Sequence, residues 1–319
     1  IRSFLIPLVY LMASLAMVGI LWFGGKSVIE GSLTIGVLAA FASYITLLVG
    51  QFLSFGWTLN GLQRGYLALQ RIYSVIDTPA FEGPQKNLPM PEEVPGRSGS
   101  KGYRIEVKDL SFAYPEQDGR ALALEGVSFK VEPGETLGIF GPTGSGKTSL
   151  VQVLARVYNP PRGTVTINGV DIVDINLPQL RDEVALIPQD PSPFSRSLRD
   201  NIVWGGEDPE ESPEDLDVRV RKAVDMACLT GDLVKLPDGL DTTVGSRGIT
   251  LSGGQRQRTA LARAFFSPFR ILLLDDVLSA VDHATEQQLI GHIYEAAKDQ
   301  TTLLVAHRLS VLEHADRIL

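Results

Sequence analysis

GPTGSGKT, residues 141–148, fits the pattern G-x-x-x-x-G-K-[ST] at every position: Gly141, Pro142, Thr143, Gly144, Ser145, Gly146, Lys147 and Thr148. The apolar run 136–140 (TLGIF) precedes this stretch, and residues 149–157 (SLVQVLARV) follow it with helical spacing. A glycine-rich turn between a strand and a helix aims successive backbone N–H groups into one concavity, and the helix N-terminus adds partial positive charge. The pattern and its context favour a phosphate-binding loop over a glycine-rich turn that happens to precede a helix.

The chemistry of this pattern assigns roles to several side chains. In a loop of this kind, Lys147 would reach the β- and γ-phosphates of ATP, and the Thr148 hydroxyl would ligate Mg²⁺. We also expect Ser149 to contact the nucleotide, because it directly follows the loop. The apolar strand at 271–274 ends at Asp275, and a carboxylate at the tip of a buried strand can hold Mg²⁺ directly or through water. ATP and Mg²⁺ are therefore the expected cofactors.

Composition narrows the class of protein. The chain has 319 residues and a formal net charge of −8, so nucleic acid is not an expected partner. Its one cysteine, Cys228, cannot form a disulfide or a cysteine-based metal site within the chain.

The N-terminal part is different in character. Residues 4–23 contain no charge and are about as long as a bilayer is thick, and residues 33–62 are also uncharged. This pattern predicts two membrane spans, the second projecting into water. A buried helical hairpin is the alternative for both segments, and a signal peptide is an alternative for the first. Arg2 before the first span, and Arg64 and Arg71 after the second, place both outer ends in the cytoplasm by the positive-inside rule.

The rest of the chain divides by composition. Residues 77–103 are rich in Pro and Gly, which predicts a linker without packed structure between residues 1–76 and 104–319. The latter region predicts an α/β domain with a parallel or mixed sheet. The expected strands are 104–107, 127–131, 136–140, 164–167, 184–187, 271–274 and 302–306, and the expected helices are 149–157, 212–229 and 256–266. The last residues, 316–319, look like the start of another strand, so we expect a fragment at both ends.

The run LSGGQ, residues 251–255, carries a resemblance to a known family. It is similar to the signature of ATP-binding-cassette (ABC) ATPases, and the chain resembles the C-terminal part of a multidrug- or lipid-type ABC exporter half-transporter. Ser252 is a good N-cap for the helix that follows, and glycines let backbone amides approach a phosphate closely. The resemblance implies that Ser252, Gly253, Gly254 and Gln255 meet ATP held by a second subunit.

Further motifs of that family follow in order. Tyr114, in SFAYP, stands where an aromatic stacks on adenine, and Gln189, in IPQD, resembles the glutamine that contacts Mg²⁺ and the attacking water. Residues 279–282 (SAVD) resemble the D-loop. His307, after the strand TTLLVA, matches the switch histidine. The resemblance therefore implies an ATPase whose catalytic residues are Asp276, His307 and Gln189.

Two positions depart from the family pattern. Asp276 stands where the family has Glu as general base, and its side chain is shorter by one C–C bond, about 1.5 Å. A shortened base with an intact LSGGQ resembles the degenerate-site member of a heterodimeric bacterial exporter. A homodimer with slow hydrolysis based on Asp276, and a nucleotide-gated regulatory subunit with little turnover, remain alternatives. The second departure is Ser246, where related exporters usually carry Glu.

The resemblance also sets expectations for architecture and location. It implies an α-helical transmembrane hairpin, the last two spans of a six-span exporter domain, followed by an α/β phosphate-loop ABC ATPase domain. The expected partners are a second half-transporter, membrane lipid, and a drug, lipid or peptide substrate. The expected location is the plasma membrane, or inner membrane of a bacterium, with several spans and a cytoplasmic ATPase domain.

Overall fold

The computed structural model describes residues 2–77, 86–96, 101–115, 122–206, 208, 210–245, 249–279, 281 and 283–319. The chain divides into two compact units, Ile1–Ala80 and Phe81–Leu319. The division between them falls inside the segment 77–103 that composition predicted as a linker.

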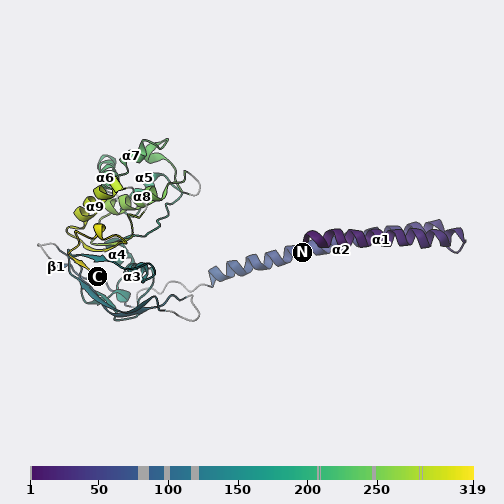
Figure 1. The fold of residues 1–319 in the computed structure, drawn as a ribbon, viewed down its shortest axis with the longest axis horizontal. Coiled ribbons are helices and arrows are strands. Elements are labelled where there is room, and N and C mark those ends of the chain that lie inside the picture. Colours follow the sequence, from purple (N-terminus) through teal and green to yellow (C-terminus); the bar gives the residue numbers. More distant parts are fainter. Residues whose placement is uncertain are drawn as a thin grey trace. The chain divides into compact units, whose positions relative to one another are not determined.

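The first unit is a pair of long helices, α1 (Arg2–Ile29) and α2 (Ile35–Ile76) (Figure 1). Thr34 caps the start of α2 by accepting a hydrogen bond from Val37 N. A Cβ added to Gly24 would lie 2.4 Å from a Leu38 methyl carbon, so the glycine allows the two helices to approach closely.

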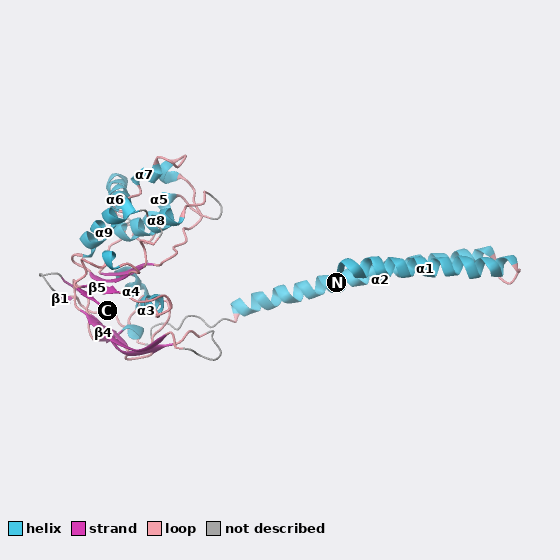
Figure 2. Ribbon diagram, viewed as in Figure 1, coloured by secondary structure: helices cyan, strands magenta, loops and turns pink. Residues whose placement is uncertain are grey.

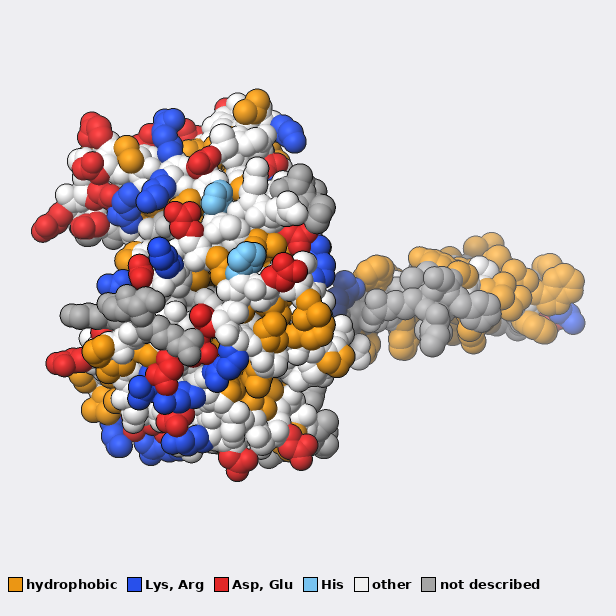
Figure 3. Space-filling view, turned by 60° about the vertical axis from the view of Figure 1, so that its left-hand side comes forward, with side chains coloured by type: hydrophobic (Ala, Val, Ile, Leu, Met, Phe, Trp, Pro, Cys, Tyr) orange, Lys and Arg blue, Asp and Glu red, His pale blue; other side chains and the backbone are white. Residues whose placement is uncertain are grey.

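Both helices are long and apolar enough to cross a membrane, over Tyr10–Ile29 and Ile35–Ile76, and none of either hydrophobic window is buried inside the structure. The side chains that can be seen on this unit in Figure 3 are mostly hydrophobic. A large exposed apolar surface needs a nonaqueous environment or a protein partner. The exposure argues against the alternative of a hairpin buried in a soluble core.

The second unit contains a five-stranded parallel sheet in the order β11-β5-β10-β9-β8 (Figure 2). Its central strands are buried on both faces, which explains why they appear as continuous apolar runs in the sequence. The strand predicted to begin within residues 316–319 is confirmed, because Arg317 and Ile318 pair with β5. The strands are β5 (Thr136–Ile139), β8 (Val184–Ile187), β9 (Ile271–Asp275), β10 (Thr301–Val305) and β11 (Arg317–Ile318).

A separate antiparallel sheet, in the order β4-β3-β6-β7, departs from the expectation of one parallel or mixed sheet. Its last two strands form a hairpin whose turn residues, Asn168 and Gly169, have φ values of 46° and 82°. An Asn-Gly pair with positive φ at both residues is the preferred two-residue hairpin turn, so the sequence holds a local signal for this hairpin. The strands are β3 (Ile105–Phe112), β4 (Leu124–Val131), β6 (Val165–Ile167) and β7 (Val170–Asp171).

Helices cover both faces of the parallel sheet and divide the core in two. Within β9, the side chains of Ile271 and Leu273 join the core that contains α3, α4 and the antiparallel sheet, whereas Leu272 and Leu274 join the core that contains α5, α6, α8 and α9. This division follows from the alternation of side chains along a strand. The helices are α3 (Lys147–Leu154), α4 (Leu177–Glu183), α5 (Leu198–Val203), α6 (Pro213–Met226), α7 (Thr230–Leu233), α8 (Gly253–Phe266) and α9 (His283–Ala297).

Part of the predicted linker is more structured than its composition suggests. Leu88 N donates a hydrogen bond to Asp174 O at 2.8 Å, and Glu93 forms a 2.7 Å ion pair with Arg270. The short strands β1 (Val94–Pro95) and β2 (Lys101–Gly102) pair antiparallel. Residues 86–96 therefore pack against the rest of the second unit, because specific backbone and charge partners outweigh a loop-like composition.

Candidate functional site: a phosphate loop and the ends of three strands

The phosphate loop connects β5 to α3 and needs glycine for steric reasons. Gly144 and Gly146 have φ values of 84° and 91°, which glycine adopts most readily. A Cβ at Gly146 would lie 2.4 Å from Ala123 O. Gly146 is also the N-cap of α3 and provides no side-chain cap, so the first N–H groups of the helix stay available for an anion.

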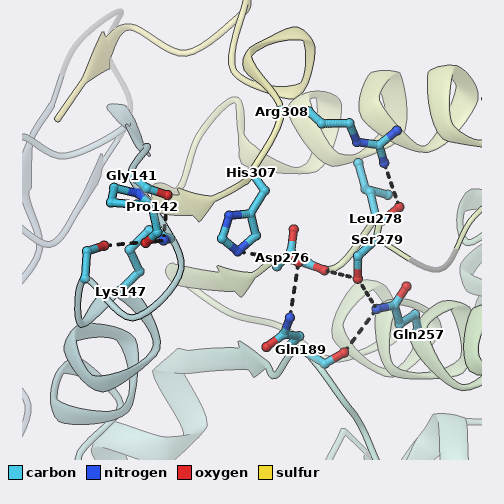
Figure 4. Close-up of polar contacts among 11 residues, drawn as sticks. Gly141, Pro142, Lys147, Gln189, Gln257, Asp276, Leu278, Ser279, His307 and Arg308 are labelled. Atoms are coloured by element: carbon cyan, nitrogen blue, oxygen red, sulfur yellow. Dashed lines mark hydrogen bonds and ion pairs between the residues drawn. The ribbon is translucent and has the colours of Figure 1, made fainter.

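Lys147 places its ammonium group over this loop. Its Nζ donates hydrogen bonds to Gly141 O at 2.8 Å and Pro142 O at 2.7 Å, as drawn in Figure 4. The Ser145 hydroxyl lies 3.4 Å from the same nitrogen. The loop thus combines backbone donors with one buried positive charge, which suits a polyphosphate.

Two of the residues predicted to hold Mg²⁺, Thr148 and Asp275, come together beside the loop, whereas a metal contact by Gln189 remains a prediction. Burial raises the pKa of the Asp275 carboxyl, the nearby Asp276 charge raises it further, and a hydrogen bond with Thr148 and the charge of Lys147 oppose these effects. A hydroxyl and a carboxylate are oxygen ligands of the kind that Mg²⁺ prefers, and Mg²⁺ usually takes few protein ligands besides phosphate and water. The donor set at Thr148 and Asp275 therefore fits Mg²⁺ bound with a nucleotide.

The predicted catalytic residues also meet at the carboxyl edge of the sheet. Gln189 follows β8, Asp276 follows β9 and His307 follows β10. Gln189 Nε2 donates to Asp276 Oδ2 at 3.2 Å, and His307 Nε2 lies 4.0 Å from the same oxygen (Figure 4). The ends of parallel strands lie side by side, so three residues distant in sequence are brought together.

Tyr114 lies close to the start of α3, but its side chain makes contacts within the domain. Its hydroxyl oxygen is 2.8 Å from Ser149 Oγ and donates to Gln152 Oε1 at 3.1 Å. Its ring meets Phe112 and Tyr158 edge-on, with centroids 5.2 and 5.1 Å apart. The stacking of Tyr114 on adenine, and a nucleotide contact by Ser149, remain predictions.

The signature residues begin α8 with a complete capping box. Ser252 Oγ accepts a hydrogen bond from Gln255 N at 3.3 Å, and Ser252 N donates to Gln255 Oε1 at 2.9 Å. Gln255 Nε2 also donates to Asp232 Oδ1 at 3.1 Å. Within the described part of the chain, the hydrogen bonds of these side chains run to α8 itself and to α7. The nucleotide contacts expected of Ser252 to Gln255 remain predictions, and Ser246, Ala280 and Asp282 lie outside the described residues.

Two residues of the site were not identified from sequence. Gln257 Nε2 donates to Gln189 O and Ser279 Oγ, and Arg308 bonds Leu278 O at 2.9 Å (Figure 4). A signal for Gln257 was present, because it stands four residues before Leu261 on the apolar face of a predicted helix. A polar residue on such a face needs a buried partner.

The phosphate loop lies between the parallel strand β5 and the helix α3. Two carboxylates lie at the end of β9, which is separated from β5 in the sheet by β10 alone. This arrangement defines a nucleoside-triphosphate-binding α/β domain. The family described as ABC transporter matches residues 124–279. Together with the fold, this match identifies the second unit as the ATP-binding domain of an ABC transporter, which is an ATPase domain.

The chain as a whole is similar to several larger proteins. It is 38% identical to the probable multidrug resistance ABC transporter ATP-binding/permease protein YheI of Bacillus subtilis, over 100% of this chain and 52% of that protein. It is 35% identical to the multidrug resistance-like ATP-binding protein MdlA of Escherichia coli, and 36% identical to the ATP-dependent lipid A-core flippase of Burkholderia orbicola; each match covers 98% of this chain and 50% of the relative. The chain therefore spans about half the length of these relatives.

A solved structure gives the same result for the fold. A bacterial Atm1-family ABC exporter with ATP bound is similar with a TM-score of 0.67 and 30% identity, over 97% of this chain and 51% of that one. The similarity includes both the helical hairpin and the ATPase domain, so the predicted succession of the two is confirmed.

Proposed function

We propose that this protein is the ATP-binding and ATP-hydrolysing subunit of an ABC exporter that moves a drug, lipid or peptide across a membrane. The similarity to multidrug and lipid A exporters over nearly the whole chain supports this function. Two helices of spanning length precede the ATPase domain, as an exporter subunit requires. The proposed location is the plasma membrane, or the inner membrane of a bacterium, with the ATPase domain in the cytoplasm.

ATP and Mg²⁺ are the proposed cofactors of this chain's own phosphate loop. Lys147 and the first N–H groups of α3 bind and orient the phosphates, and Thr148 with Asp275 holds the metal ion, which neutralises phosphate charge when it is bound. The signature residues at the start of α8 act on ATP held by a second half-transporter. The chain thus contributes to two composite sites.

The observation that carries the ATPase proposal is the arrangement of Asp276 with Gln189 and His307. A carboxylate that accepts from a glutamine amide at 3.2 Å, with an imidazole 4.0 Å away, can orient water and accept its proton. Asp276 has a φ of 49°, a conformation in which Asp is enriched among non-glycine residues.

We further propose that ATP hydrolysis is weakened at the site formed by this chain's own phosphate loop and Asp276, and that the chain works as one half of a heterodimer. A misplacement near 1 Å can lower a rate about 100-fold, which corresponds to about 2.7 kcal/mol of barrier. The Asp276 side chain is shorter than Glu by a similar length. In the heterodimer, ATP stays in the Lys147 loop over many cycles, and turnover occurs mainly at the site completed by Ser252 to Gln255.

Substitution at Asp276 separates the heterodimer from a homodimer. With the full-length transporter assembled, Asp276→Asn should change total ATPase less than about twofold, because it removes a base that is already too short. Asp276→Glu should raise hydrolysis at this site if Gln189 and His307 still orient the water. ATPase rates of wild type and both variants, with and without a second half-transporter, provide the measurement. A loss of most activity in Asp276→Asn beside an intact second half-transporter would contradict the weakened site.

A further inference from the structure

A chain of hydrogen bonds joins the signature helix α8 to the turn that carries Asp276 (Figure 4). Gln257 Nε2 lies 3.0 Å from Gln189 O and 3.2 Å from Ser279 Oγ. Ser279 Oγ in turn lies 3.0 Å from Asp276 O. One side chain on α8 therefore contacts the backbone of Gln189 directly and the backbone of Asp276 through a single hydroxyl.

The donor and the acceptor in each of these hydrogen bonds are fixed by chemistry. The carbonyl oxygens of Gln189 and Asp276 can only accept, so the single proton of Ser279 goes to Asp276 O. The Ser279 oxygen must then accept from the Gln257 amide, which uses its two N–H groups on Ser279 and Gln189. Hydrogen bonds arranged in sequence with one polarity strengthen one another.

Burial makes this connection costly to lose. Gln257 is 3% exposed and lies on the same face of α8 as the fully buried Leu261. A buried side-chain amide left without acceptors loses the free energy of solvation without compensation, so Gln257 keeps both of its bonds. The neighbouring Arg256 adds a 3.0 Å ion pair to Asp190, so α8 holds the turn after β8 at two adjacent residues.

The backbone that Gln257 holds is the one that aims the catalytic carboxylate. Asp276 has a φ of 49°, its N–H donates to Val305 O at 3.0 Å, and its carbonyl oxygen accepts from Ser279. Strained conformations of this kind persist where the surroundings determine them. Gln257 thus restrains both partners of the bond between Gln189 Nε2 and Asp276 Oδ2.

We propose that Gln257 is a positioning residue that ties the geometry of this chain's own catalytic residues to the position of α8. The inference rests on the proposed function, in which the N-terminus of α8 meets ATP held by the second half-transporter. A shift of α8 when that ATP binds or leaves moves Gln257 and, through it, Gln189 and Asp276. The two composite sites are then coupled inside one chain without a contact between their nucleotides.

The test separates ATP binding from turnover at this chain's own loop. In the full-length assembled transporter, photolabelling of this chain with 8-azido-ATP at low temperature reports binding, and vanadate-dependent labelling after warming reports turnover. Gln257→Met keeps the approximate volume and removes both donors. We expect vanadate-dependent labelling to fall about tenfold and binding to stay within twofold of wild type.

Thr259→Val is the matched control, because Thr259 is also 3% exposed on α8 and its hydroxyl donates to Gln255 O of the preceding turn at 2.8 Å. It should leave both kinds of labelling within twofold. Ser279→Ala cuts the same chain of bonds at an exposed residue, so it tests the inference even if Gln257→Met does not fold. The double variant should lose no more turnover than Gln257→Met alone, since both changes break one connection.

Three results would overturn the inference: unchanged turnover in Gln257→Met or Ser279→Ala, equal losses of binding and turnover in a folded variant, or additive effects in the double variant. Because the own site is proposed to be weakened, wild-type vanadate-dependent labelling of this chain should be slow but measurable. Its complete absence would contradict the ATP-hydrolysing role proposed for this chain, and the inference would fall with it. Wild-type labelling with unaffected variants would contradict the inference alone.

Discussion

Two helices of the ATPase domain begin at glycine-rich segments, and their N-termini are completed in different ways. At α3 the N-cap is Gly146, which has no side chain to satisfy the first N–H groups. At α8 the N-cap is Ser252, and its hydroxyl and the Gln255 amide oxygen each accept a backbone N–H of the other residue. The first helix leaves its donors open for an anion, whereas the second satisfies part of its own.

The difference suggests that the N-termini of α3 and α8 have different roles in binding ATP. An uncapped N-terminus with Lys147 beside it is a complete anion site within one chain. A capped N-terminus is stable without ligand and still presents the donors of its first turn, Gly253 and Gly254, that a capping box does not use. This is the behaviour expected of a surface that meets a phosphate only when a second subunit brings it.

The largest expected effect comes from removing the cation of the α3 site. Lys147→Ala should weaken MgATP binding about 100-fold, since hydrogen bonds to charged groups contribute about 1.5–3 kcal/mol and each tenfold change corresponds to about 1.4 kcal/mol. Titration calorimetry of the full-length protein would measure the change.

Lys222→Ala removes an exposed lysine of α6 and serves as the control for a loss of charge. Unchanged MgATP affinity in a folded Lys147→Ala protein would show that α3 does not begin a nucleotide site, and the contrast between the two helices would lose its basis.

A smaller effect is expected at the capped helix. Ser252→Ala removes the N-cap of α8 and should lower the free energy of unfolding by about 1 kcal/mol. It should also slow turnover in the second half-transporter's site several-fold, because the first turn of α8 is less well held. Thermal unfolding and ATPase assays on the assembled transporter would measure the two effects.

Ser212→Ala is a matched control, because Ser212 caps α6 in the same way by accepting from Asp215 N at 3.2 Å. It should cost similar stability and leave turnover unchanged. If both serine variants slowed turnover equally, the effect of Ser252 would be one of stability alone.

The features predicted correctly from the sequence were those set by local pattern. The phosphate loop, the apolar strands of the parallel sheet and the two long helices each follow from composition or spacing within a short stretch. The meeting of Gln189, Asp276 and His307 was predicted only through resemblance to a family, because nothing in their spacing shows which strand ends are neighbours.

The features missed from the sequence depend on partners far along the chain. The antiparallel sheet pairs Ile105 with Ile167, and the packing of residues 86–96 depends on Asp174 and Arg270. The role of Gln257 depends on Ser279, which is brought to α8 by the fold of β9. Local propensity carries no information about such pairs, although the Asn168-Gly169 turn was a local signal that could have been used.

The central claim is that this chain's phosphate loop and its signature residues serve two different ATP molecules. Gly253→Asp tests it most directly, because it places a carboxylate where the second subunit's γ-phosphate must approach. In the assembled full-length transporter, 8-azido-ATP should still label this chain's loop as in wild type, and vanadate-dependent labelling of the second subunit should be lost. Loss of binding at this chain's own loop, with undisturbed turnover in the second subunit, would contradict the account.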